Sequence, residues 1–347
     1  MIGYRLRLRE CLEKSTVGLI GPREIQLEIL RRRLMKSPPS LASIKRWLKQ
    51  AGLSAVAEDS GDATYYPTFQ KADDLALFSC DWIARYLKGG EKVFVFHTIN
   101  LRTHQLAQTI RTDKSTPSAC EHVLEAFSTI GLPDFLQIDN DAAFTGLGRT
   151  KPVIGRFLRL LLYLGIEVIF IPPGEPKRNH VVERANGIWA RSFWDKDRFS
   201  SVREVRRKAV KFLRWYDGYS PPSLGGKTVQ QAATEQRLPK LRAPQIARIP
   251  KQLPLTAGRL HFLRRVDANG EINILKEQWK ASKTMIDKYV WATLDLRRKE
   301  LAIYYRVSSR AQARLLLRYE YEVNEPVQSL LPEYKRRTRQ IEILKRI

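Results

Sequence analysis

The apolar runs between residues 75 and 194 follow one another in an order that few folds can accommodate. Three β-prone runs come first, and turns such as Lys88-Gly89-Gly90-Glu91 separate them, as in an antiparallel meander. Helical and β-prone runs then alternate, which gives the order β-β-β-α-β-α-β-α and predicts an α/β domain. The runs cover residues 75–83, 93–96, 105–110, 118–130, 135–138, 153–164, 167–171 and 179–194.

Three acidic residues occupy special places in this order. Asp81 lies inside the first apolar run, where an unpaired carboxylate would cost free energy that metal coordination can offset. Asp139 directly follows a short β-prone run, at the carboxyl end of a predicted strand. Glu183 falls with Asn179 and Asn186 on the polar side of the last helix. The opposite side of that helix carries Val182, Ala185, Trp189 and Phe193.

Three carboxylates brought together on one sheet can hold two divalent cations. Such a pair of ions stabilises both the attacking and the leaving oxygen of a phosphodiester, and Mg²⁺ prefers carboxylate ligands. No CxxC or paired Cys/His spacing occurs, so a zinc site is not indicated. Taken singly, Asp139 could be a turn or cap residue, and Glu183 a surface acid paired with Arg184. Together the acids predict a site for two Mg²⁺ or Mn²⁺ ions that acts on DNA.

The excess of positive charge indicates a polyanionic partner. The chain has 61 Lys and Arg against 36 Asp and Glu, a formal net charge of +25, and nucleic acid fits this charge better than an anionic membrane surface. No apolar run approaches the roughly 20 residues that span a bilayer, and the N-terminus lacks the apolar core of a secretion signal. We therefore expect a cytoplasmic protein that binds DNA and no membrane.

Residues 1–53 are a predicted helical DNA-binding module, followed by a linker at 54–72. A Gly-Pro pair can start one helix, and Ser40 can cap a second. Two short helices joined by a tight turn fit a helix-turn-helix DNA reader, and a generic basic helical pair is the alternative. The residues expected to contact DNA on the second helix are Lys45, Arg46 and Lys49.

The C-terminal third of the chain returns to β character. Asn269-Gly270 suits a tight turn and favours a hairpin between residues 260–266 and 271–275. The predicted division of this part of the chain is an α/β core at 73–220, a linker at 221–254, a small β-barrel at 255–310 and a charged helical tail at 311–347.

The motifs around the three acids resemble those of the DDE transposase and integrase family, in its bacterial insertion-sequence branch. The resemblance covers residues 73–220 and implies an RNase H-like core similar to that of retroviral integrases, which the order of elements also favours. The shared motifs are Ser79-Cys80-Asp81-Trp82, Gln137-Ile138-Asp139-Asn140-Asp141-Ala142-Ala143-Phe144 and Pro172-Pro173-Gly174-Glu175-Pro176-Lys177-Arg178-Asn179-His180-Val181-Val182-Glu183.

The resemblance implies roles for individual residues. Asp81, Asp139 and Glu183 would be the catalytic triad that binds the metal ions. Asn140 would orient the loop of the second acid, and Asn179 belongs to the signature that precedes the last acid. The residues implied to contact DNA phosphates are Lys177, Arg178 and Arg184.

The implied activity is metal-dependent cleavage of DNA strands at the ends of a mobile element, followed by strand transfer into target DNA. Two DNA ends must be joined together, so we expect a homo-oligomer assembled on DNA, located at the nucleoid of a bacterial cytoplasm. A catalytically inactive DNA-binding protein or repressor derived from a transposase is one alternative, and an RNase H-like DNA nuclease is another.

Two features of the sequence leave the identity of the metal ligands open. Asp141 stands where the family often has Gly, and it is a rival metal ligand. Asp73 and Asp74 are alternatives to Asp81 as the first acid. In addition, Asn100 stands where relatives often carry another acid, which would lie outside the metal site.

Overall fold

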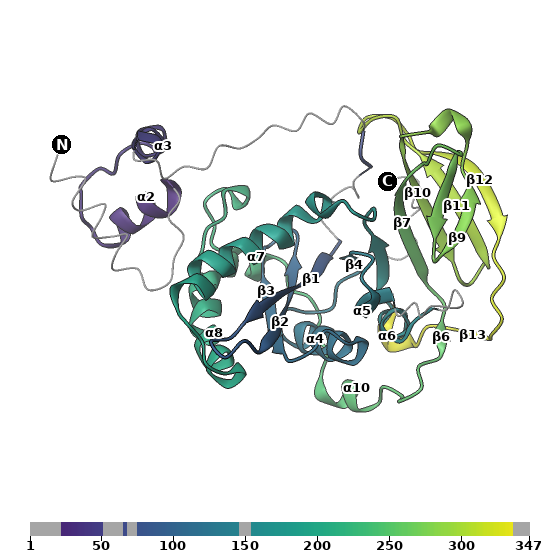
Figure 1. The fold of residues 1–347 in the computed structure, drawn as a ribbon, viewed down its shortest axis with the longest axis horizontal. Helices are drawn as coiled ribbons and strands as arrows, with labels where there is room; N and C mark the ends of the chain where they lie inside the picture. Colours follow the sequence, from purple (N-terminus) through teal and green to yellow (C-terminus); the bar gives the residue numbers. More distant parts are fainter. Residues whose placement is uncertain (1–21, 51–64, 68–74, 146–153, 336–347) are drawn as a thin grey trace.

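The computed structural model describes residues 22–50, 65–67, 75–145 and 154–335 (Figure 1). The largest feature is a nine-stranded mixed sheet with the order β12-β11-β10-β7-β5-β4-β1-β2-β3. Figure 1 shows helices around the half of the sheet that contains β1 to β5, while the C-terminal strands form the other half.

The five strands of the predicted core are neighbours in this sheet. β1 (Leu77–Tyr86), β2 (Lys92–Asn100) and β3 (Leu106–Arg111) make the expected antiparallel meander. β4 (Phe135–Ile138) pairs in parallel with β1, and β5 (Glu167–Phe170) pairs in parallel with β4. The predicted order of elements and the RNase H-like α/β core are therefore confirmed.

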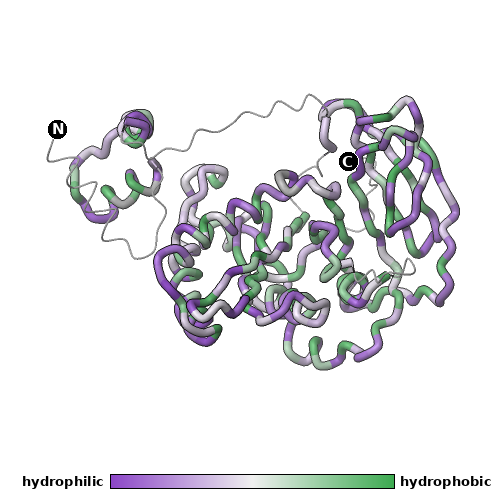
Figure 2. The backbone as a smooth tube through the Cα atoms, in the orientation of Figure 1, coloured by the Kyte–Doolittle hydropathy of each residue, from purple (hydrophilic) through white to green (hydrophobic). Residues whose placement is uncertain are grey.

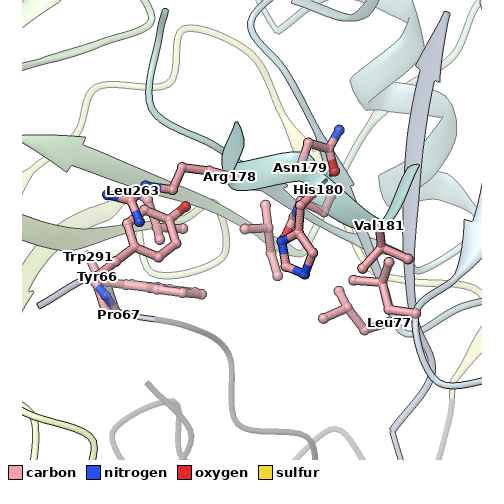
Figure 3. Close-up of a pocket in the computed structure, with 12 residues that line it drawn as sticks. Tyr66, Pro67, Leu77, Arg178, Asn179, His180, Val181, Leu263 and Trp291 are labelled. Carbon is pink, nitrogen blue, oxygen red and sulfur yellow. Dashed lines mark hydrogen bonds between the residues drawn. The ribbon is translucent and has the colours of Figure 1, made fainter. Parts of the chain in front are cut away.

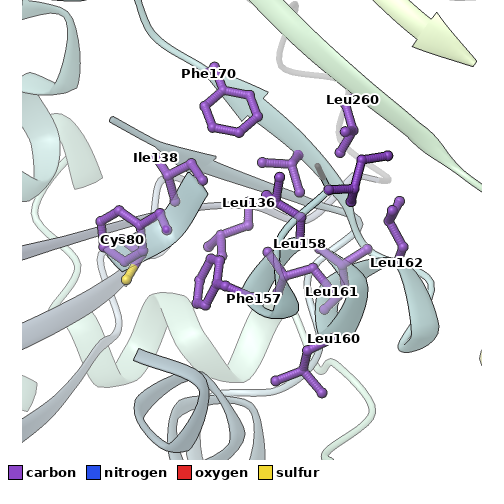
Figure 4. Close-up of a cluster of buried hydrophobic side chains, with 14 of the residues drawn as sticks. Cys80, Leu136, Ile138, Phe157, Leu158, Leu160, Leu161, Leu162, Phe170 and Leu260 are labelled. Carbon is purple, nitrogen blue, oxygen red and sulfur yellow. The ribbon is translucent and has the colours of Figure 1, made fainter. Parts of the chain in front are cut away.

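Helices cover both faces of this half of the sheet. Successive side chains of a strand point to opposite faces, so Phe96 of β2 packs in the core under α4 and α6, whereas Val95 packs under α7 and α8. Figure 4 shows the α6 side of the first core, including Leu136 and Phe157. The helices are α4 (Thr116–Thr129), α5 (Ala142–Thr145), α6 (Arg156–Tyr163), α7 (His180–Ser192) and α8 (Val202–Asp217).

The C-terminal strands extend the core sheet, and the expected separate barrel at 255–310 is not confirmed. β7 pairs in parallel with β5 from Val168↔Leu260 to Phe170↔Phe262, and β10, β11 and β12 follow as antiparallel neighbours. The open edge of β5 presents unpaired backbone groups, which β7 satisfies. The strands are β7 (Arg259–Arg265), β10 (Tyr289–Asp295), β11 (Glu300–Tyr305) and β12 (Arg314–Glu320).

Two predictions for this region are wrong. The expected hairpin between 260–266 and 271–275 does not form, because β8 (Glu271–Ile274) pairs with β9 (Glu277–Lys280) through a turn in which Leu275 and Lys276 have positive φ. The charged tail has no α-helix in its described part: β12 pairs with β11, and β13 (Val327–Gln328) pairs with β6 (Leu255–Thr256). The helical propensity of this charged segment is weak, and pairing with the exposed edges of neighbouring strands decides its conformation instead. Residues 336–347 lie outside the described residues.

The predicted N-terminal helices are confirmed as helices. α2 (Pro22–Arg31) and α3 (Leu41–Gln50) pack through a small apolar cluster. Lys45, Arg46 and Lys49 are exposed on α3, and Arg31 Nη2 donates to the carbonyl oxygen of Gly218 at 3.0 Å. The cluster consists of Ile25, Ile29, Ile44 and Leu48. Most of the predicted linker 54–72, and residues 1–21 of the module, lie outside the described residues.

The remaining elements are short or peripheral. α8 is amphipathic and carries both polar and apolar residues (Figure 2). α9 (Val229–Glu235) and α10 (Ala243–Ala247) fall in the predicted linker 221–254. In the ranges that the structure describes, no helix is both long and apolar enough to cross a membrane. The 3-10 helices are η1 (Pro176–Asn179), η2 (Trp194–Lys196), η3 (Pro222–Leu224), η4 (Lys283–Met285) and η5 (Pro332–Tyr334).

Candidate active site

The three predicted acids line one pocket of about 320 Å³. Asp81 comes from β1, Asp139 follows β4, and Glu183 lies in the first turn of α7. The pocket is therefore bounded by three elements that are distant in sequence. Its other lining residues are Asn140, Asp141, Ile171, Pro172, Pro173, Gly174, Glu175 and Asn179.

The strand register explains why the two aspartates meet. Ser79 of β1 stands opposite Gln137 of β4 in the parallel pair. Asp81 and Asp139 each come two residues later, so their side chains leave the same face of the sheet at the same level.

Asn179 connects the end of η1 to both strands. Its amide oxygen accepts hydrogen bonds from Gln137 Nε2 at 3.0 Å and from the Ser79 hydroxyl. The side chain is buried, with 4% of its surface exposed. Because Glu183 lies one turn further along, this contact fixes the start of α7 beside the two aspartates.

All three carboxyl groups have pKa values above their ordinary range, and burial is the largest cause for each. Burial, the charge of Asp139 and, to a smaller extent, the charge of Glu183 raise the pKa of Asp81 to about 7, although two hydrogen bonds oppose the rise. Burial also raises the pKa values of Asp139 and Glu183. A cation placed between these groups would relieve both the repulsion and the desolvation.

The donor set of the pocket suits a hard divalent cation, since it consists of carboxylate and amide oxygens. Across the described ranges, however, no three Asp, Glu, His or Cys side chains are already gathered in an arrangement that would hold a metal ion. The three acids line the same pocket, but their carboxyl groups are not close enough together to form a metal site.

A chain of buried polar groups orients Asp81. Asn186 Nδ2 donates to Asp81 Oδ2 at 2.9 Å, and the backbone N–H of Trp82 donates to Asp81 Oδ1 at 2.7 Å. His97 Nδ1 lies 2.5 Å from Asn186 Oδ1 and donates to it. Burial lowers the pKa of His97 to about 4, so the ring is neutral near pH 7. The sequence placed Asn186 on the polar side of its helix but gave no role to His97.

The loop after Asp139 is held by several hydrogen bonds. Asn140 Nδ2 donates to the carbonyl oxygen of Ile171 at 2.7 Å. The backbone N–H of Asp141 donates to Asp139 Oδ1 at 3.0 Å, and the Asp141 carboxylate accepts from Ala143 N at 2.8 Å and from Lys114 Nζ at 3.0 Å. Asp141 lines the pocket, yet its carboxylate already caps α5 and pairs with a lysine.

Asn100, at the position where relatives often carry an acid, does not line the pocket. It is buried at the end of β2, where its amide oxygen accepts from the N–H groups of Arg102 and Thr103. Asp73 and Asp74, the rivals of Asp81 as the first acid, lie outside the described residues.

The predicted DNA contacts of the core are placed unequally. Arg184 is exposed on α7. Arg178 is half-buried: it pairs with Glu175 at 3.1 Å, donates to the Tyr289 hydroxyl at 3.2 Å and lies over the Tyr66 ring at 4.2 Å (Figure 3). The Lys177 side chain lies outside the described part of the structure. Of the two side chains that the structure describes, Arg184 is the exposed one.

The sequence of the α7 region matches a known family. Residues 164–228 match the sequence model of the integrase core domain, and this segment contains Asn179 and Glu183. No curated protein sequence matches the chain significantly.

Several solved structures are similar to this chain at low identity. The HTLV-2 integrase catalytic core domain in complex with magnesium (trimeric form) is 17% identical, with a TM-score of 0.35, over 45% of this chain and 95% of that one. The simian T-cell lymphotropic virus intasome in complex with the PP2A regulatory subunit B56 gamma is 16% identical in sequence, with a TM-score of 0.41. The similarity covers 88% of this chain and 96% of that one. The BIV integrase catalytic core domain is 18% identical in sequence, with a TM-score of 0.34, over 46% of this chain and 93% of that one.

All three TM-scores are below 0.5, so the assignment depends on the sequence match and not on these structures. The match falls on the helix that carries the third acid of the pocket. The resemblance to the DDE transposase and integrase family is thus confirmed, and the chain carries an integrase core domain sequence at residues 164–228.

Proposed function

We propose that this chain is a DDE-type DNA transposase or integrase that cleaves DNA strands at element ends and transfers them into target DNA. The observation that carries the proposal is that Asp81, Asp139 and Glu183, from three separate elements, line one pocket and all have raised pKa values. Perturbed acids gathered in one cleft are typical of catalytic sites.

The triad would hold two Mg²⁺ or Mn²⁺ ions. When bound, the pair supplies Lewis acidity to the entering and leaving oxygens of the phosphodiester. The remaining residues orient the triad: Asn186 directs one oxygen of Asp81, and Asn179 keeps α7 in register with β1 and β4. No serine or tyrosine nucleophile is required by this chemistry.

The DNA would be bound by charge distributed over two parts of the chain. Lys45, Arg46 and Lys49 form an exposed basic face on α3, and Arg184 is exposed on the helix that carries Glu183. Lys177 belongs to the same proposal through the family resemblance, and Arg178 would first have to leave Glu175. We also propose that the active form is a homo-oligomer assembled on two DNA ends.

Glu183→Gln tests the catalytic assignment, because it removes the negative charge and keeps the shape. The substrate is a supercoiled plasmid that carries the DNA flanking the gene, incubated with Mn²⁺. Wild-type protein should produce nicked and joined products, whereas Glu183→Gln should reduce both at least about 100-fold and retain DNA binding.

Glu204→Gln is the matched control, since Glu204 lies on α8 outside the pocket, where it pairs with Lys208. It should leave product formation unchanged. Full activity of Glu183→Gln would reject the assignment of this residue. Wild-type protein that binds DNA without cutting it would indicate an inactive DNA-binding protein, and cut products without joined ones would indicate a nuclease.

A further inference from the structure

Arg264 of β7 is a buried arginine at the back of the active-site pocket. Its exposed fraction is 5%, and it comes from the C-terminal half of the sheet, outside the predicted core at 73–220. None of its hydrogen bonds within the described residues goes to a carboxylate. Burying a guanidinium without an anion costs free energy, which its hydrogen bonds must offset.

The guanidinium holds two loops that form walls of the pocket. Arg264 Nη2 donates to Asn140 Oδ1 at 2.8 Å, and Arg264 Nη1 donates to the carbonyl oxygen of Ile171 at 3.0 Å. Asn140 Nδ2 donates to the same Ile171 carbonyl at 2.7 Å. Arg264 of β7 and the residues that follow β4 and β5 therefore form a closed hydrogen-bonded triangle behind the acids.

This triangle leads directly to the second acid. Asn140 immediately follows Asp139, and the next backbone N–H, that of Asp141, donates to Asp139 Oδ1 at 3.0 Å. Fixing the Asn140 side chain thus fixes the turn that aims the Asp139 carboxylate. On the other side, Ile171 leads into the Pro172-Pro173 loop, which also lines the pocket.

The neighbouring strand makes a second contact of the same kind. The Tyr289 hydroxyl of β10 donates to Glu175 Oε2 at 2.7 Å, and Glu175 lines the pocket beside the acids. Arg264 is itself tied to the β8–β9 hairpin, because its Nε donates to the carbonyl oxygen of Asn273 at 2.8 Å. The C-terminal strands consequently hold both walls of the site.

We propose that Arg264 is a positioning residue for metal binding, which orients Asp139 through Asn140 and makes the C-terminal strands part of the active site. The inference rests on the proposed function, because it takes Asp139 to be a metal ligand. Groups that orient metal ligands from behind typically contribute 10–100-fold to metal affinity, and the fixed planar fork of arginine suits two acceptors on separate loops.

The test measures Mn²⁺ binding by titration calorimetry on the full chain without DNA. Arg264→Met and Asn140→Ala should each weaken Mn²⁺ binding at least about 10-fold. The double variant should be no weaker than the poorer single variant, because both changes break the same connection. Arg264→Lys should recover part of the affinity, since one donor can reach one of the two loops.

Arg306→Met is the matched control. Arg306 is equally buried and also donates to backbone carbonyls, at 2.7 Å to Ala311, but it lies in the loop between β11 and β12. Its variant should lower the melting temperature and leave Mn²⁺ affinity within about twofold of wild type. If Arg264→Met does not fold, Arg264→Lys and Asn140→Ala give the answer.

The outcomes separate the two proposals. Wild-type protein that binds no Mn²⁺, with Asp139→Asn behaving identically, would reject the proposed function and this inference with it. Wild-type protein that binds Mn²⁺ in an Asp139-dependent way, together with unchanged affinity in the Arg264 and Asn140 variants, would overturn the positioning role alone. A loss of affinity in Arg306→Met as large as in Arg264→Met would likewise overturn it.

Discussion

Asn179 Oδ1 and Gln137 Nε2 are joined by a 3.0 Å hydrogen bond that ties the start of α7 to β4. The same oxygen accepts from Ser79 on β1, so a single amide stands behind both strands that carry the aspartates. Each partner lies two residues before its aspartate. The geometry of the three acids therefore depends on a group that contributes no charge.

Asn179→Ala should destabilise the fold and weaken metal binding together. The change leaves the buried Ser79 hydroxyl and the partly buried Gln137 amide without this acceptor, which costs about 1–3 kcal/mol of unfolding free energy. Denaturant unfolding and Mn²⁺ titration measure the two effects. Asn100→Ala is the control, because Asn100 is also buried and hydrogen-bonded but does not line the pocket. Equal losses of metal affinity in both variants would contradict a specific role for Asn179.

Without divalent cations, the stability of the protein should fall between about pH 4 and about pH 7. The folded-state pKa of Asp81 is raised to about 7, while an unfolded chain ionises near its ordinary value of about 3.9. Over that interval the unfolded state has lost a proton that the folded state still holds, so rising pH favours unfolding, by up to roughly 4 kcal/mol for this group. The loss is complete above the folded-state pKa.

Asp81→Asn should flatten this dependence of stability on pH. Excess Mn²⁺ at about pH 7.5, above the folded-state pKa, should raise the stability of the wild-type protein and not that of the variant. Asp195→Asn, an exposed acid in η2, should leave the profile as it is. Thermal unfolding recorded across the pH range decides the matter. A variant profile parallel to that of wild type would mean that Asp81 ionises normally.

The acids were predictable because their signals are local. Asp81 interrupts an apolar strand, Asp139 ends one, and helical spacing alone directs Glu183 away from the buried side of α7. The supporting asparagines were partly predictable for the same reason. Roles for Asp81, Asp139 and Glu183 in catalysis remain predictions, which the variants above test.

The contributions of the C-terminal strands were not predictable, because they depend on pairing between distant segments. No local pattern indicates that β7 pairs in parallel with β5. Glu167 of β5 and Arg259 of β7 form an ion pair at 2.8 Å, although 92 residues separate them in the sequence. Once that pairing exists, Arg264 must lie behind Asn140. The predicted helix at β12 is wrong for a related reason: charged residues are tolerated on an exposed edge strand, so charge does not exclude a strand there.

The basic face of α3 should contribute sequence-independent affinity for DNA. Each lysine that neutralises a phosphate adds about 0.9 to the slope of log affinity against log salt concentration, so Lys45→Ala combined with Lys49→Ala should reduce the slope by about 2. Fluorescence anisotropy at several salt concentrations measures it. Lys240→Ala, an exposed lysine between α9 and α10, should change neither slope nor affinity. An unchanged slope in the double variant would remove α3 from the DNA interface.

Gly131→Ala should destabilise the core without touching the pocket. Gly131 has φ +95, and a Cβ there would lie 2.5 Å from Leu238 Cβ. The close approach docks the chain after α9 onto the end of α4, where Leu132 N donates to the Pro239 carbonyl at 2.8 Å.

Backbone strain and overpacking each cost about 1–3 kcal/mol, so thermal unfolding should show a loss of at least about 2 kcal/mol for this variant. Gly89→Ala is the matched control, because its added Cβ meets nothing within 4 Å, and its effect should stay within about 0.5 kcal/mol. Mn²⁺ affinity should be unchanged in both variants, since neither glycine lines the pocket. Equal stability of the two variants would show that the segment around Leu238 moves away freely, and that its contact with α4 contributes little to the fold.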